Sequence, residues 1–181
     1  MPQKLISVTG RDRPGIISAV TGVFYKSGAN LEDISMTILE GEFAMMMIVR
    51  LPGSGVEGRV RRGLENLEKK MGLTINTRPL AARRASAKHS RGTVPHLVTV
   101  AGLDRTGIVH RVADFFASKK MNITDLNSKI LSQGKRGLYV LMLEVDIPAA
   151  FLKPALARGL EKLARKLRVD IQIKPMDPIE F

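Results

Sequence analysis

The stretch LISVTGRDRPGIISAVTGVF, residues 5–24, decides the fold of this chain because it occurs twice. A closely similar stretch, LVTVAGLDRTGIVHRVADFF, occupies residues 97–116, and the two align without a gap at an offset of 92 residues. Each stretch begins with alternating apolar and polar residues, which predicts a strand, and continues with apolar residues at helical spacing. A long period that is present only twice indicates two copies of one domain rather than a solenoid.

The residues after the repeated stretch extend each copy to six elements. In the first copy, residues 30–39 and 42–51 predict a hairpin of two strands, residues 56–72 an amphipathic helix, and residues 73–79 a last strand. The second copy predicts the same order, with a longer hairpin and with a helix over residues 148–168. The order β-α-β-β-α-β predicts an α+β protein of two ferredoxin-like domains with antiparallel sheets.

Local signals in the first copy sharpen these expectations. Pro14 is expected in the first turn of the first helix, and Gly28 is placed to end that helix. The methionine run at residues 45–47 predicts a strand that is buried on both faces.

The organisation along the chain follows from the repeat. We expect a first domain over residues 1–80, a basic linker over residues 81–95 and a second domain over residues 96–181. The linker segment has no apolar period and no acidic residue, and it carries four basic residues: Arg83, Arg84, Lys88 and Arg91. This composition predicts a flexible linker.

Composition excludes several classes of protein. The 181 residues include no cysteine, which excludes disulfides and thiolate zinc sites. Histidines occur only at 89, 96 and 110 and share no ligand spacing, so no metal site is predicted. No apolar run approaches the roughly 20 residues of a membrane span, and the start does not have the pattern of a signal peptide. We therefore expect a cytoplasmic protein without a membrane partner.

The sequence also lacks the patterns of the common catalytic sites. No serine stands in a nucleophile elbow, and the glycines fit neither a P-loop nor a dinucleotide fingerprint. We accordingly expect neither an enzyme nor a cofactor.

The repeated loop between strand and helix has the chemistry to bind an amino acid. Backbone N–H groups at a helix start have no intrahelical partner and attract a carboxylate. Gly15 and Gly107 have no Cβ, so a ligand can approach the backbone closely. Asp12 and Asp104 can accept hydrogen bonds from an ammonium group. An amino acid carries both of these charged groups.

Both copies resemble ACT domains, small regulatory modules that bind amino acids. The resemblance rests on Asp-Arg-Pro-Gly after the first strand and on an asparagine before the second. The two-copy layout is similar to that of the glycine cleavage system transcriptional repressor family. The resemblance implies sheets that associate side by side, with the ligand at an interface between domains. The ligand-binding positions that it implies are Asp12, Gly15, Ile16 and Asn30 in the first copy, and Asp104, Gly107, Ile108 and Asn122 in the second.

The two loops are not identical. Thr106 stands where the family pattern and the first copy have proline, so the second loop is expected to be less constrained. We therefore expect the first loop to be the tighter site.

These features together predict a protein that senses a small amino acid and passes the ligand state to a protein partner. The repressor likeness suggests a transcription regulator as the partner and glycine metabolism as the setting, and side-by-side association suggests a homodimer.

Two alternatives stay open. The formal net charge of +12 fits a basic adaptor that binds nucleic acid nonspecifically through phosphate contacts. Sequence-specific reading of RNA is not expected, because aromatic residues make up only 4% of the chain and offer no base-stacking surface. The other alternative is a structural tandem module whose ligand sites have decayed.

Overall fold

The computed structural model of the chain divides into two compact units, Met1–Arg84 and Ala85–Phe181. Each unit has its own hydrophobic core. The residues that the structure describes are 2–80, 89, 92–131, 137–151 and 154–176.

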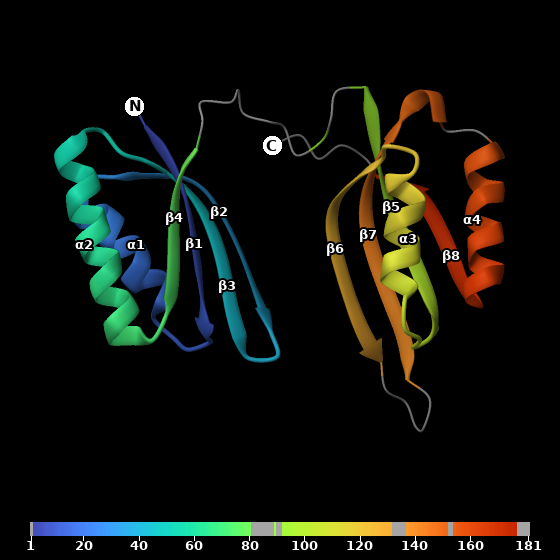
Figure 1. Ribbon diagram of the computed structural model, residues 1–181, viewed down its shortest axis with the longest axis horizontal. Coiled ribbons are helices and arrows are strands. Elements are labelled where there is room, and N and C mark those ends of the chain that lie inside the picture. The colour runs from blue at the N-terminus through green and yellow to red at the C-terminus, as the bar shows by residue number, and fades with distance from the viewer. Residues whose placement is uncertain (1, 81–88, 90–91, 132–136, 152–153, 177–181) are drawn as a thin grey trace. The chain divides into compact units, whose positions relative to one another are not determined.

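The first unit is a four-stranded antiparallel sheet with two helices on one face (Figure 1). The strands lie in the order β2-β3-β1-β4. The elements follow one another along the chain as β1 (Gln3–Arg11), α1 (Ile16–Ser27), β2 (Asn30–Leu39), β3 (Glu42–Arg50), α2 (Ser54–Met71) and β4 (Thr74–Leu80).

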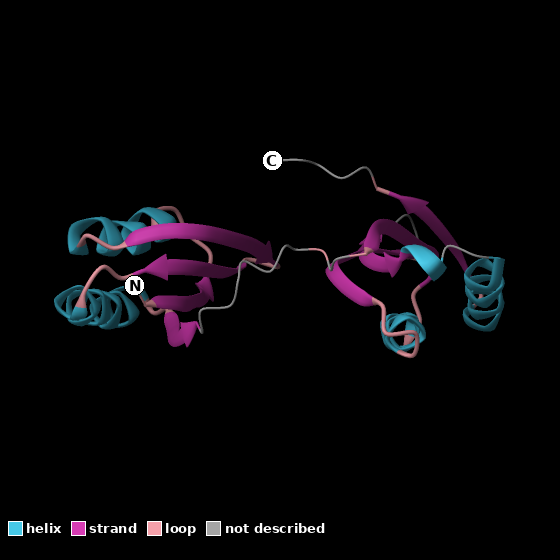
Figure 2. Cartoon of the chain, turned by 90° about the horizontal axis from the view of Figure 1, so that it is seen from above, coloured by secondary structure: helices cyan, strands magenta, loops and turns pink. Residues whose placement is uncertain are grey.

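The second unit repeats this architecture, with strand order β6-β7-β5-β8. Figure 2 shows each sheet with its helices in a separate layer. The elements are β5 (Thr93–Leu103), α3 (Ile108–Ala117), β6 (Asn122–Leu131), β7 (Leu138–Pro148), the short 3₁₀ helix η1 (Ala149–Phe151), α4 (Pro154–Leu167) and β8 (Val169–Pro175). The predicted α+β fold with two βαββαβ copies is confirmed.

Equivalent side chains of the two copies form the cores. In α1, Ile16, Val20 and Phe24 are buried, and their counterparts in α3 are Ile108, Val112 and Phe116. The spacing of four residues places each trio on one side of its helix, against the sheet. Burying one such side chain contributes roughly 1.5–3 kcal/mol, so the shared pattern fixes how each helix packs.

In each unit, a glycine of the second helix faces a side chain of the first helix. A Cβ on Gly63 of α2 would lie 2.5 Å from Val23 Cγ1 of α1. A Cβ on Gly159 of α4 would lie 3.0 Å from the Phe115 ring of α3. Both distances are shorter than ordinary van der Waals contact, so a side chain at either position would press on Val23 or Phe115.

Two departures from the expected helices have a clear local cause. Helix α1 begins at Ile16, so Pro14 lies in the turn before the helix and not in its first turn, because Gly15 adopts a left-handed conformation (φ 95°). The predicted helix over residues 148–168 is interrupted: η1 ends at Phe151 and α4 begins at Pro154. Proline has no N–H to donate and clashes with the preceding turn, so it starts a helix but does not continue one.

The prediction that the methionine strand is buried on both faces is wrong. Met45 and Met47 are buried under the helices, whereas Met46 points to the other face of the sheet and is 52% exposed. Both helices of the unit cover the same face, so alternate residues of β3 lie on the uncovered one.

Part of the expected linker over residues 81–95 lies outside the described residues, namely 81–88 and 90–91. Within the same segment, β5 begins at Thr93. His89 contacts β7: its Nδ1 lies 2.7 Å from Asp146 Oδ1, and its Nε2 lies 3.3 Å from Glu144 Oε1. The turn of the longer hairpin, residues 132–136, also lies outside the described residues.

Among the helices that the structure describes, none is both long enough and apolar enough to cross a membrane.

Candidate functional site

The loop between β1 and α1 leaves the helix start open to a ligand. Gly15 is the N-cap residue, and its carbonyl accepts the first helical hydrogen bond, from the Ala19 N–H at 2.9 Å. In the described part of the chain, no side chain caps this helix start. The first N–H groups of α1 therefore lack the side-chain acceptor that usually satisfies them.

The loop between β5 and α3 has the same geometry. Gly107 is the N-cap residue with φ 93°, close to the 95° of Gly15, and its carbonyl accepts from the Arg111 N–H at 3.0 Å. Again, no described side chain caps the helix start. Each unit thus presents a helix start without a side-chain cap among the described residues, together with the positive end of a helix dipole, which is the environment that a carboxylate prefers.

The first glycine of each motif serves packing. A Cβ on Gly10 would lie 2.8 Å from Leu73 Cδ2, and a Cβ on Gly102 would lie 2.7 Å from Val169 Cγ1. The two glycines of each motif therefore have different roles. One allows the end of the first strand to approach the start of the last strand, and the other supplies the positive φ at the helix start.

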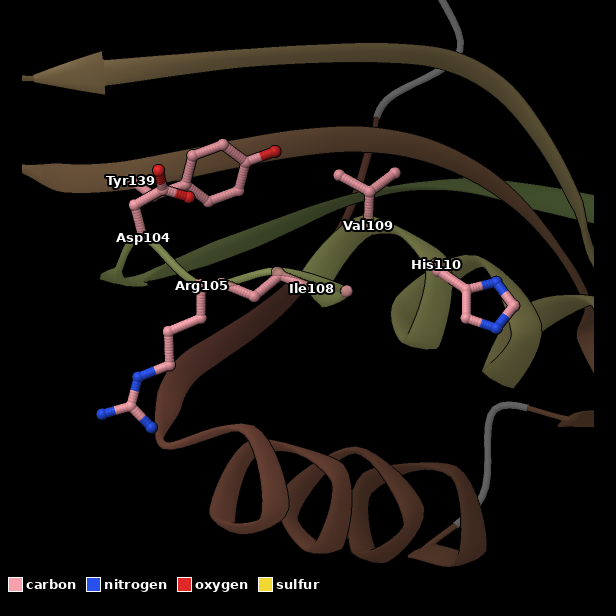
Figure 3. Close-up of a pocket in the computed structure, with 7 residues that line it drawn as sticks. Asp104, Arg105, Ile108, Val109, His110 and Tyr139 are labelled. Atoms are coloured by element: carbon pink, nitrogen blue, oxygen red, sulfur yellow. The ribbon is translucent and has the colours of Figure 1, made fainter.

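The arginine of the first motif anchors the loop. Arg13 Nη2 donates a hydrogen bond to the carbonyl of Met71, in the last turn of α2. The neighbouring Asp12 N–H donates to the Gly41 carbonyl at 2.8 Å, which ties the loop to the β2–β3 hairpin. In the second unit, Arg105 points away from Asp104 (Figure 3). The side chains of Asp12 and Asp104 are both exposed.

A cavity of about 470 Å³ adjoins the second loop. It opens to solvent between the loop, the first turn of α3 and β7 (Figure 3). Its lining includes Asp104, Gly107 and Ile108 from the predicted set, together with Arg105, Val109, His110 and Tyr139. The loop acid and the open helix start of the second copy therefore face one cavity.

The predicted isoleucines contribute backbone rather than side chain. The side chains of Ile16 and Ile108 are 1% and 2% exposed and belong to the two cores. Only their N–H groups, at the helix starts, can face a ligand.

The predicted asparagines lie far from the loops of their own copies. Asn30 begins β2 and pairs with Arg50, whereas the loop is tied to Gly41 at the other end of the hairpin. The nine residue steps of β2 span about 30 Å at roughly 3.3 Å per residue. Asn122 begins β6 in the same way, paired with Asp146. A single unit therefore does not bring its asparagine and its loop together.

Sequence reasoning missed Arg105, Val109, His110 and Tyr139 as lining residues. Tyr139 pairs with Gly102 across β5 and β7, which places its side chain beside the loop. An alignment of the two hairpins could have revealed Tyr139. Its counterpart in the first copy is Phe43, which pairs with Gly10 as Tyr139 pairs with Gly102. The first copy buries that phenylalanine at 2% exposure.

Comparison with known proteins agrees with this architecture. The family profile described as ACT domain matches residues 3–78. A UPF0237 protein of Methanopyrus kandleri is 37% identical over 76 residues, which are 41% of this chain and 84% of the relative. A UPF0237 protein of Clostridium acetobutylicum is 36% identical over 72 residues, 39% of this chain and 81% of the relative.

Two solved structures match along the whole chain. A protein of unknown function from Galdieria sulphuraria superposes with a TM-score of 0.78 at 26% identity, covering 97% of this chain and 99% of that protein. A protein assigned as a glycine cleavage system transcriptional repressor superposes with a TM-score of 0.74 at 19% identity, covering 98% of each chain. With both copies of the fold in place, the chain belongs to the ACT-domain family, as a tandem ACT-domain protein.

Proposed function

We propose that this chain is a regulatory protein that senses a small amino acid and passes its ligand state to a protein partner. The observation that carries the proposal is the pair of uncapped helix starts, after Gly15 and after Gly107, each close in sequence to an exposed aspartate. Two such sites in one chain, built from the same motif, offer a carboxylate donor and an ammonium acceptor together.

The ligand binds through its two charged groups. Its carboxylate accepts hydrogen bonds from the N–H groups that begin α1 or α3, where the helix dipole adds attraction. Its ammonium group donates to Asp12 or Asp104. In the second unit, Tyr139 and Val109 line the space beside the loop and are placed to contact the ligand side chain.

A neighbouring ACT domain completes each site. Within one unit the asparagine lies at the far end of β2, so the asparagine that meets the ligand comes from a partner strand. β2 lies at the edge of its sheet, and an edge strand can pair with a strand of another sheet through its backbone, which supports side-by-side association. This pairing gives a homodimer, and we propose a transcription regulator of glycine metabolism as the protein partner on the likeness to the repressor family.

A thermal-shift panel of the twenty amino acids on the full chain tests the proposal. We expect glycine, serine or another small amino acid to raise the melting temperature. A ligand at 100 times its Kd adds about 2.7 kcal/mol to stability. Absence of any shift across the panel contradicts amino-acid sensing.

Matched aspartate variants then test the site. Asp12→Ala and Asp104→Ala each remove an ammonium partner, so we expect each to weaken binding by about 1.5–3 kcal/mol in calorimetry. Asp114→Ala is the control, because Asp114 is an exposed aspartate of α3 that does not line the cavity. Equal affinity in all three variants removes the loop aspartates from the site.

A further inference from the structure

A second cavity, of about 200 Å³, lies in the first unit between α2 and the strands β1 and β4. Figure 1 shows these elements in the first unit. The cavity has an apolar floor of four core residues that are each less than 5% exposed: Ile6, Leu51, Val60 and Leu64. An apolar cavity of roughly 150 Å³ stays dry and takes up benzene, so the space and lining suit a small apolar group.

The remaining lining residues are polar, and they carry more positive than negative charge. Lys4 Nζ lies 2.7 Å from Glu57 Oε1, and the Lys4 side chain is only 16% exposed while that of Glu57 is 50% exposed. Arg61 is mostly exposed and lies 3.6 Å from Glu65, an exposed pair that contributes at most about 1 kcal/mol. Thr77 of β4 supplies a hydroxyl. The lining therefore holds two cations and one carboxylate beside an apolar floor.

The second copy has different residues at the polar positions. Lys4 aligns with His96, which is 3% exposed and lies with its Nδ1 2.8 Å from the Val94 carbonyl oxygen. Thr77, opposite Ile6, aligns with Ile173, opposite Val98. Ile173 packs against the second core. Arg61 aligns with Ala157. The first copy therefore has Lys and Thr where the second copy has a buried histidine and a core-packing isoleucine, and it has Arg61 where the second copy has an exposed alanine.

We infer that this cavity is a binding site for a small monocarboxylate with an aromatic or branched apolar tail. The tail occupies the apolar floor, and the carboxylate takes the position of Glu57 at Lys4. Glu57 is the mobile member of the ion pair, because its half-exposed side chain can turn to solvent while Lys4 is held by its buried stem. The site is separate from the loops after β1 and β5, and it does not require that the loops bind amino acids.

A titration of the full chain by methyl NMR tests the site, with benzoate and isovalerate as probes. We expect saturable shifts of the Leu51, Val60 and Leu64 methyl signals. Acetate lacks the tail and benzyl alcohol lacks the charge. We therefore expect each to bind at least about tenfold more weakly than benzoate. The absence of saturable shifts with both probes overturns the inference.

Three variants localise the binding. Lys4→Met keeps the apolar stem and removes the charge, so we expect affinity to fall about tenfold or more. Thr77→Ile installs the residue of the second copy, so we expect it to fill the cavity, abolish binding and raise the melting temperature. Lys69→Met is the matched control, because Lys69 is an exposed lysine of α2 outside the cavity, and we expect unchanged affinity.

Failure of the monocarboxylate site can be told apart from failure of amino-acid sensing. Benzoate binding that survives both Lys4→Met and Thr77→Ile overturns the inference whatever the amino-acid panel shows. If Lys4→Met does not fold, Thr77→Ile alone decides, since it adds apolar bulk to the cavity. Asp12→Ala should leave benzoate affinity unchanged, and a loss there would assign the probe to the loop instead.

Discussion

At the scale of single residues, the two glycines of the repeated motif set the geometry of the loop. Gly10 makes room for a neighbour, because a Cβ there would lie 2.8 Å from Cδ2 of Leu73, the residue before β4. Gly15 is required for another reason: nothing lies within 4 Å of its Cβ position, but its φ of 95° belongs to a region that L-residues with a side chain disfavour. The helix start opens to a ligand because this residue turns the backbone there.

Replacing Gly15 tests that role. Gly15→Ala should lower the free energy of unfolding of the first unit by about 1–2 kcal/mol, the strain of a left-handed L-residue. Gly22→Ala is the control: Gly22 lies inside α1 with open space around it, so alanine should stabilise by about 0.8–1 kcal/mol. Urea titrations followed by the NMR signals of the first unit measure both. Equal stability of Gly15→Ala and the parent chain would show that the helix start relaxes without cost.

At the scale of elements, the packing of α2 against α1 depends on one small residue, Gly63. Gly63→Ala places a methyl group 2.5 Å from Val23, so we expect a loss of about 1–3 kcal/mol from overpacking. Gly58→Ala in the same helix faces only the end of the Arg62 side chain at 3.7 Å and should stabilise. Melting temperatures of the two variants should move in opposite directions; a shared direction would mean that the helices separate freely.

Elements were predictable from sequence where local chemistry fixes them. The bounds of β2 and β8 match the predicted segments 30–39 and 169–175, and Gly28 ends α1 as expected. The start of α4 was not predicted, because apolar spacing continued across Pro154 and outweighed the proline. The exposure of Met46 could not be read from composition, since a methionine run looks the same whether one face or both are covered.

Predictability was lower for the site. The motif repeat identified Asp104, Gly107 and Ile108, which line the cavity of the second unit. Tyr139 joins them only through the pairing of β5 with β7, a contact between residues far apart in sequence. The cavity beside Lys4 depends on how α2 packs on the sheet, which no linear pattern encodes.

At the scale of the whole molecule, duplication has given two loops with one backbone geometry and different chemistry. The φ angles of Gly15 and Gly107 differ by only 2° (95° against 93°). Pro14 precedes the first of these glycines, whereas Thr106 precedes the second. Since the folded geometry is shared, a difference in affinity must come from neighbouring side chains or from the freedom that each loop loses on binding.

The conformational freedom of the two loops should differ. Pro14 fixes its own φ near −65° and restricts the residue before it, so the first loop has less to order when a carboxylate arrives. Ordering one backbone residue costs about 1–2 kcal/mol, which is roughly tenfold in affinity. We therefore expect Thr106→Pro to tighten the second site and Pro14→Thr to weaken the first. Calorimetry with an amino acid from the panel measures each site alone, with Asp104→Ala or Asp12→Ala silencing the other. Two sites of equal affinity that neither exchange alters would show that loop preorganisation does not distinguish the copies.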